Sequence, residues 1–119
     1  PPPILSGLVG SEMCIRDSII ASHIKPGKID EYQALIDSEA GVKTTRNYKG
    51  CISLETSYNE DSNMYFIIEN WESAELYQEY LNWRLTEDPS GLVSDIVPLL
   101  VGGESGMKVY NPNTRYKLY

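Results

Sequence analysis

The chain has 119 residues and is acidic, with 17 Asp and Glu residues, 10 Lys and Arg residues and a formal net charge of −7. This balance argues against nucleic acid, whose phosphates are bound by Lys and Arg, and no apolar run approaches the roughly 20 residues of a membrane-spanning helix. The composition therefore predicts a cytoplasmic protein that contacts neither nucleic acid nor a membrane.

The first 17 residues show no helix or strand pattern. From Gly7 to Asp17 the sequence GLVGSEMCIRD resembles the translation of a transposon-end adapter used in preparing sequencing libraries. A signal peptide is the alternative, but it needs a basic start and an apolar run of about 7–15 residues, and the first basic residue here is Arg16. We expect residues 1–17 to be non-native and loose, as in a chain from a metagenomic assembly. Residues 18–119 then form one domain with a single cysteine, Cys51, and no internal disulfide.

The first predicted element is a strand over residues 18–25, which is rich in isoleucine and ends at a Lys-Pro-Gly turn. A helix is predicted next, over residues 28–41, and it is either interrupted at Gly41 or continued to residue 48. Gly50 closes this region, since glycine is typical just past a helix end. The residues on one face of this helix are Ile29, Tyr32, Leu35 and Ile36.

Residues 51–58 and 64–71 read as two strands joined by a polar loop of five residues, which predicts a hairpin. Ser73 is the expected cap of a helix over residues 74–85. A second helix is expected to start at Asp88-Pro89, because an acceptor followed by proline is typical of a helix start, and Pro98 would end or kink it. The last predicted strand covers residues 105–111.

The element order is β-α-β-β-α-(α)-β, which predicts an α+β, ferredoxin-like antiparallel sheet with helices on one face. The strand over residues 64–71 is apolar on both sides, with Met64, Phe66 and Ile68 on one and Tyr65, Ile67 and Trp71 on the other. A strand of this kind is buried on both faces. We expect helices to cover one face, and a second copy to cover the face with Ile67 and Trp71. This predicts a homodimer, which the tail over residues 112–119 could reach.

Four stretches of the sequence carry a resemblance to a known family. HIKPGKIDEYQAL, NYKGCISLE, YFIIENWESAELYQEYLNWR and IVPLLVGG, in this order and spacing, resemble the antibiotic biosynthesis monooxygenase (ABM) superfamily of dimeric α/β barrels. The resemblance covers nearly all of residues 19–111. It implies a dimer whose sheets enclose a cavity, and an activity like that of many members, the cofactor-free oxygenation of quinols or aromatic polyketides. Other members degrade haem or isomerise small metabolites.

Four residues are candidates for catalysis. Trp71 matches the family's tryptophan at the end of the third strand, although a large ring there also packs well without a chemical role. Glu69 shares a face with Trp71, and a carboxylate among apolar neighbours has a raised pKa and can act as a base, whereas an ion pair is the alternative. Tyr80 stands where many relatives carry a histidine. His23 is the only histidine and would be the natural base near neutral pH if it faced the cavity.

Four further residues are candidates for substrate binding. Tyr65 and Ile67 belong to the same strand face as Glu69, whereas Tyr77 and Arg84 share a helix face with Tyr80. The helical set could bind a phenol or a carboxylate, or could simply pack against the sheet. No histidine follows position 23 to ligate haem, and no cluster of histidine, cysteine and carboxylates predicts a metal site. We therefore expect neither a cofactor nor a bound metal ion.

Two functions of different classes follow from these residues. The first is a cofactor-independent monooxygenase of a small aromatic or quinol-type substrate. The second is a non-catalytic or non-oxygenase dimeric α/β barrel that binds a small hydrophobic metabolite or another protein, which the missing helix histidine favours. Oxygen uptake on a panel of quinols separates them.

Overall fold

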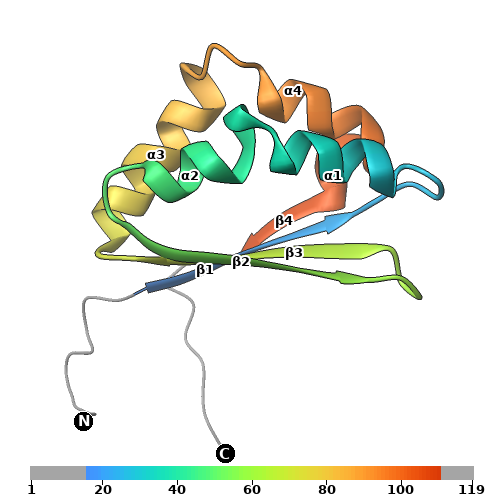
Figure 1. The fold of residues 1–119 in the computed structure, drawn as a ribbon, viewed down its shortest axis with the longest axis horizontal. Coiled ribbons are helices and arrows are strands. Elements are labelled where there is room, and N and C mark those ends of the chain that lie inside the picture. The colour runs from blue at the N-terminus through green and yellow to red at the C-terminus, as the bar shows by residue number, and fades with distance from the viewer. Residues whose placement is uncertain (1–15, 111–119) are drawn as a thin grey trace, which may run out of the picture.

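The computed structural model describes residues 16–110, which form two layers, a sheet and a set of helices that covers one of its faces (Figure 1). The sheet is antiparallel with the order β2-β3-β1-β4, so the ferredoxin-like prediction is confirmed. The strands are β1 Arg16–His23, β2 Cys51–Asn59, β3 Met64–Trp71 and β4 Met107–Tyr110. The helices are α1 Ile29–Asp37, η1 Glu39–Lys43, α2 Thr44–Asn47, α3 Ala74–Thr86, α4 Leu92–Ile96, η2 Val97–Leu99 and η3 Gly103–Gly106.

The central strand β3 shows which face of the sheet the helices cover. Its residues alternate between half-buried and buried, and the buried set is Tyr65, Ile67, Glu69 and Trp71. Tyr65 packs edge-on against Tyr32 of α1, and Trp71 packs against two tyrosines of α3. The expectation that Ile67 and Trp71 lie on the open face is therefore wrong. Both strand faces are apolar, so the pattern of β3 alone could not tell which of them meets the helices.

The open face of the sheet carries the other half of the alternation. Phe66 and Ile68 of β3 lie opposite Ala21 and Ile19 of β1, and Tyr110 of β4 is opposite Ile19 on the other side. No described element packs over this central apolar stripe (Figure 1). The outer strand β2 contributes mostly polar residues to the same face, so the stripe is bordered on one side by polar groups.

Strand β1 starts two residues before the predicted domain boundary. Arg16 pairs with Trp71 and Asp17 with Asn70, so the ladder begins inside the segment that was expected to be non-native. The rest of that segment, residues 1–15, lies outside the described residues, as does the tail over residues 112–119.

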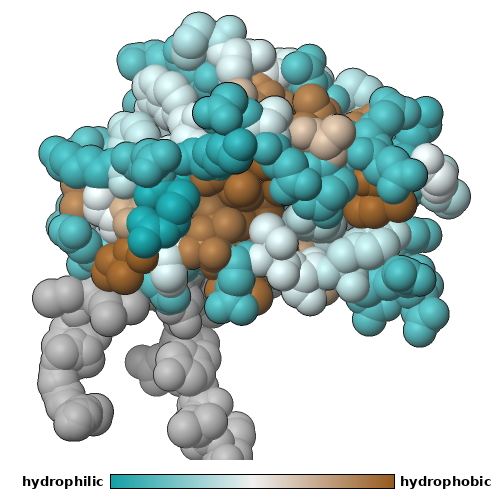
Figure 2. All heavy atoms as spheres, viewed as in Figure 1, coloured by the Kyte–Doolittle hydropathy of each residue, from teal (hydrophilic) through white to brown (hydrophobic). Residues whose placement is uncertain are grey.

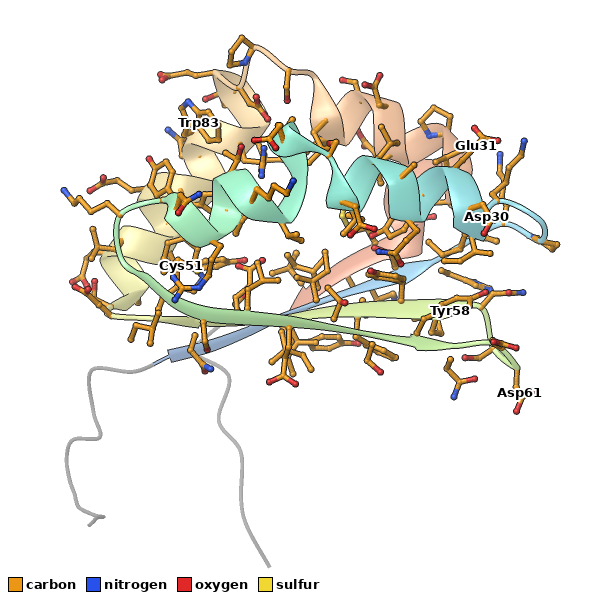
Figure 3. The ribbon with its side chains drawn as sticks, in the orientation of Figure 1. Asp30, Glu31, Cys51, Tyr58, Asp61 and Trp83 are labelled. Carbon is orange, nitrogen blue, oxygen red and sulfur yellow. The ribbon has the colours of Figure 1, made fainter. Side chains whose placement is uncertain are left out.

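The first helical region turns sharply at Gly41. This glycine is buried and has a non-helical conformation with φ −81° and ψ −129°. A Cβ atom there would collide with the backbone oxygens of Ile36 and Leu35, so only glycine fits. Helix α1 therefore ends at Asp37, and the chain continues as two short helices up to Asn47. At the opposite end of α1, the acidic first-turn residues Asp30 and Glu31 point outward, as Figure 3 shows.

Of the two helix starts that were predicted after residue 71, one is confirmed and the other is wrong. Ser73 caps α3, because its hydroxyl accepts a hydrogen bond from the Leu76 amide at 3.2 Å, so that prediction is confirmed. The predicted helix start at Asp88-Pro89 is wrong, since α4 begins at Leu92 after Gly91. The carboxylate of Asp88 does accept a backbone amide, that of Ser90, but its other oxygen is bound by a side chain of α3.

Candidate functional site

A cavity of about 240 Å³ lies between the helix-covered face of the sheet and the helices. Figure 2 shows apolar side chains gathered between these two layers on one side of the molecule. The cavity opens beside α3 and β4, where the lining residues Leu85 and Val109 are exposed. It lies within one chain, whereas the sequence resemblance implied a cavity enclosed by the sheets of a dimer. The polar side chains among its lining residues are Tyr32, Thr45, Glu69, Tyr80 and Arg84.

Glu69 is the carboxylate of this cavity, and it is only 1% exposed. The alternation of β3 places it on the same face as Trp71, whose indole Nε1 donates to Glu69 Oε1 at 3.0 Å. Burial raises the pKa of Glu69 to about 7, although the Trp71 hydrogen bond and the charge of Arg84 act in the opposite direction. Among the side chains that the structure describes, those of residues 18–110, Trp71 is the donor that is hydrogen-bonded to Glu69. At neutral pH this carboxyl group can therefore both give and take a proton.

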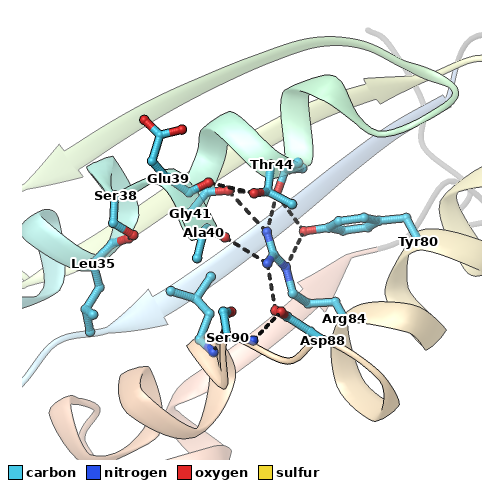
Figure 4. A network of polar contacts seen from close by, with 12 residues as sticks. Leu35, Ser38, Glu39, Ala40, Gly41, Thr44, Tyr80, Arg84, Asp88 and Ser90 are labelled. Atoms are coloured by element: carbon cyan, nitrogen blue, oxygen red, sulfur yellow. Dashed lines mark hydrogen bonds and ion pairs between the residues drawn. The ribbon is translucent and has the colours of Figure 1, made fainter.

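Arg84 of α3 faces the same cavity and binds the turn at Gly41 (Figure 4). Its Nη1 donates to the Ala40 carbonyl and to Asp88 Oδ2, both at 2.8 Å. Its Nη2 donates to the Gly41 carbonyl at 3.2 Å and to Thr45 Oγ1 at 2.8 Å. Its Nε donates to the Tyr80 hydroxyl at 3.0 Å. A guanidinium group has five N–H donors, so every donor of Arg84 is engaged.

Tyr80 joins the two charged residues. Its ring lies 5.0 Å from that of Trp71, centroid to centroid, and its hydroxyl lies 2.6 Å from Thr45 Oγ1. Burial raises the pKa of Tyr80, and the charge of Arg84 lowers it only in part. The hydroxyl therefore keeps its proton at neutral pH and can act as a hydrogen-bond donor. The cavity thus combines an apolar wall, one buried carboxyl group and two buried phenols, those of Tyr80 and Tyr32.

The sequence of this chain matches a protein-family model. The model described as antibiotic biosynthesis monooxygenase matches residues 18–84, which is more than half of the chain. The chain belongs to the antibiotic biosynthesis monooxygenase family. The match begins at Ser18, the first residue after the segment that resembles an adapter, and it contains Glu69, Trp71 and Tyr80.

Solved structures of similar fold support this assignment at the level of architecture. A conserved protein from Methanosarcina mazei Go1 is 15% identical, with a TM-score of 0.67, over 83% of this chain and 91% of that chain. Rv0793 from Mycobacterium tuberculosis is 17% identical, with a TM-score of 0.65, over 88% of this chain and 99% of that one. A structure named antibiotic biosynthesis monooxygenase is 20% identical, with a TM-score of 0.65, over 86% and 99%. No curated protein matches the sequence.

The structure brings together most of the candidate residues of this ABM chain. Glu69, Tyr80, Ile67 and Arg84 line one cavity, and Trp71 lies behind Glu69. His23 does not join them. It lies on the open face of the sheet, beside a separate hollow that Lys108 and Ser105 also line.

The two remaining candidates, Tyr65 and Tyr77, are both buried at 1% exposure and neither is among the lining residues of the cavity. Their hydroxyls have no hydrogen-bond partner among the described residues. The Tyr65 ring packs against Tyr32, and the Tyr77 ring against Trp71. In the structure, therefore, both side chains contribute packing around the site.

Sequence reasoning missed Thr45 and Asp88. Asp88 follows Arg84 by four residues, which is the spacing of an ion pair on one helix face, and this signal could have been read from the sequence. Thr45 could not have been found in this way, because it reaches Arg84 only through the turn at Gly41. Within residues 18–110 no group of three or more His, Cys, Asp or Glu side chains is arranged to hold a metal ion. The same part of the chain contains no helix that is long and apolar enough to cross a membrane.

Proposed function

We propose that this ABM-family chain is a cofactor-independent monooxygenase of a small aromatic, quinol-type substrate. The observation that carries the proposal is the Glu69 carboxyl group, which is buried against an apolar cavity and has a pKa raised to about 7. A general base works best when its pKa lies near the operating pH. An apolar cavity of this size suits a small planar ring.

In this reaction the substrate supplies the electrons. Glu69 removes a proton from a phenol or from an activated ring carbon, and the resulting phenolate or carbanion reduces dioxygen. When a ring CH₂ group becomes a carbonyl, one oxygen atom of O₂ enters the product, the other leaves as water, and four electrons come from the substrate. The apolar walls keep the anion from being solvated, and this makes it a stronger reductant.

The surrounding residues have supporting roles in this proposal. Trp71 donates to one oxygen of Glu69 and thereby holds the carboxyl group in place. Arg84, whose donors are all used inside the protein, positions Tyr80 and lowers the local negative potential. His23 lies on the other face of the sheet and has no part in the reaction.

Oxygen uptake with a panel of hydroquinones and anthrone-like phenols tests the proposal. Glu69→Gln should lower kcat/KM by about 100-fold or more, the range expected for loss of a general base. Glu79→Gln is the matched control, because Glu79 is exposed on α3 and has no described hydrogen-bond or ion-pair partner. Wild-type protein that consumes no oxygen with any member of the panel would contradict the proposal, as would equal rates for wild type and Glu69→Gln.

We further propose that two copies join through their open sheet faces. The support is the apolar stripe of Ile19, Phe66, Ile68 and Tyr110, since contiguous apolar surface of this kind marks an interface. Sedimentation of the full chain and of a chain starting at Ser18 should both give a dimer. Phe66→Glu should yield a monomer, whereas Gln78→Glu, at an exposed position of α3 in the layer that covers the other face, should not. A wild-type monomer at micromolar concentration would exclude this assembly.

Binding of a hydrophobic metabolite without turnover is the second candidate function. It is favoured by Tyr80, which stands where many relatives carry a histidine and which keeps its proton at neutral pH. Tight binding of the panel compounds under conditions where no oxygen is consumed would select this function over the first.

A further inference from the structure

The hydroxyl of Tyr80 is held from one side by two residues whose own hydrogen bonds are nearly fixed (Figure 4). Arg84 Nε donates to it at 3.0 Å, and Thr45 Oγ1 lies 2.6 Å away. Arg84 cannot rotate to other partners without breaking contacts to the Ala40 and Gly41 carbonyls and to Asp88. The position of the phenol oxygen is therefore set by the protein, while the direction of its hydrogen is not.

Two arrangements of the hydroxyl hydrogens satisfy this geometry. In the first, Tyr80 donates to Thr45, and Thr45 donates to the Gly41 carbonyl, which is 3.5 Å away and thus a weak contact. In the second, Thr45 donates to Tyr80, whose own hydrogen is then free for another acceptor. The exchange costs only the weak contact, because the Gly41 carbonyl still accepts from Arg84 Nη2.

The second arrangement has its free hydrogen beside the cavity. Tyr80, Thr45 and Arg84 all line the cavity, and most of the other lining side chains are apolar. An incoming oxygen atom therefore finds one pre-positioned neutral donor, with the guanidinium charge directly behind it. That charge favours an acceptor that carries or develops negative charge.

We propose that Tyr80 is the donor that binds the oxygen atom of the ligand, a phenol, a phenolate or a ketone that can enolise, and that Thr45 and Arg84 position it for this contact. The inference rests on the proposed function in taking the cavity as the ligand site, and it deepens that function by naming how the substrate oxygen is recognised. Glu69 then faces the proton to be removed, while Tyr80 holds the oxygen on which charge collects.

A binding titration with 4-nitrophenol tests the inference without turnover. Tyr80→Phe should weaken binding of 4-nitrophenol by about 10–100-fold, the range for a hydrogen bond to a charged or partly charged group. Binding of 4-nitrotoluene, which has the same shape but no hydroxyl, should change by less than about twofold. Tyr48→Phe is the matched control, since it removes a hydroxyl from a ring that contacts Tyr80 but is not among the cavity's lining residues.

The positioning role of Thr45 has a separate readout. Because 4-nitrophenol changes its absorption on ionisation, its spectrum gives its pKa while it is bound. Thr45→Val should raise the pKa of the bound phenol relative to wild type, and Thr45→Ser, which restores the hydroxyl, should return it. A purely structural role would weaken both ligands alike and leave that pKa unchanged.

Three results would overturn the inference. The first is equal affinity of wild type and Tyr80→Phe for 4-nitrophenol. The second is a Tyr80→Phe variant that loses as much affinity for 4-nitrotoluene as for 4-nitrophenol. The third is a pKa of bound 4-nitrophenol that is the same in Thr45→Val as in wild type. Failure of the oxygenase proposal looks different, because an absence of oxygen uptake would leave the ligand discrimination by Tyr80 intact.

Discussion

Two buried charged residues face the same cavity, and the protein treats them in opposite ways. Arg84 has a partner for every N–H donor and an acidic neighbour, Asp88, at 2.8 Å. Among the described side chains, Glu69 has one hydrogen bond, from Trp71, and takes part in no ion pair. Arg84 is thus a fully paired charge within the fold, whereas Glu69 is a buried carboxyl group with few partners.

The pKa values reflect the same contrast. Burial raises the pKa of Asp88, but hydrogen bonds from Arg84 and Ser90 outweigh this effect, so that pKa lies below its usual value. For Glu69, burial dominates and the pKa rises to about 7. A fully satisfied ion pair does not titrate near neutral pH, whereas an under-solvated carboxyl group does.

Removing Arg84 should have the largest effect on stability. Arg84→Ala leaves Asp88 as an uncompensated charge and removes the donors to the carbonyls at the Gly41 turn. We therefore expect the free energy of unfolding to fall by about 3–5 kcal/mol. Urea unfolding of the purified variant measures the loss. Arg84→Met keeps the packing volume but not the donors and should recover only part of it. A loss below about 1 kcal/mol for Arg84→Ala would show that the network contributes little.

Replacing Glu69 should change how stability depends on pH. A carboxyl group whose pKa is raised on folding stabilises the folded chain at low pH, and this contribution is lost as pH rises from 4.5 to about 7. One pKa unit corresponds to about 1.4 kcal/mol. The free energy of unfolding of Glu69→Gln, relative to that of wild type, should therefore be about 3 kcal/mol higher at pH 8 than at pH 4.5. Urea unfolding at both pH values gives this difference, in which constant costs of the substitution cancel. Glu79→Gln, at an exposed position of α3, is the matched control for the substitution itself.

Replacing Trp71 should make Glu69 harder to ionise. Trp71→Phe keeps an aromatic ring but removes the N–H that donates to Glu69, an interaction worth about 1 kcal/mol. The pKa of Glu69, followed by NMR titration of its carboxyl carbon, should therefore move upward by roughly one unit. Trp83→Phe is the control, because the Trp83 ring does not contact Glu69 through a described hydrogen bond. An unchanged midpoint in Trp71→Phe would mean that the indole does not influence the base.

An exposed ion pair should show the smallest effect. Lys43 Nζ lies 3.0 Å from Glu39 Oε2 in η1, and the two side chains are 58% and 90% exposed. The side chains of Arg84 and Asp88 are only 5% and 4% exposed. Lys43→Ala should cost no more than about 0.5 kcal/mol in urea unfolding. A cost that approaches that of Arg84→Ala would remove burial as the explanation of the contrast.

The sequence predicted the elements that depend on local rules. The hairpin strands, the serine cap of α3 and the shared face of Glu69 and Trp71 follow from alternation and capping, and the structure has all three. The features that depend on long-range contact were not predictable in this way. Which face of β3 meets the helices depends on how α1 and α3 pack. The Asp88 carboxylate, where a helix start was predicted, is bound by Arg84, and α4 begins at Leu92. Thr45 contacts Arg84 only because the chain turns at Gly41.

The pKa of the Glu69 carboxyl group decides whether this residue can act as a base near neutral pH. It can be measured by titrating protein with ¹³C-labelled glutamate side chains and following the carboxyl carbon resonances by NMR, with Glu69→Gln assigning the signal. We expect the Glu69 resonance to titrate near pH 7. A titration at or below the ordinary value of 4.5 would contradict it.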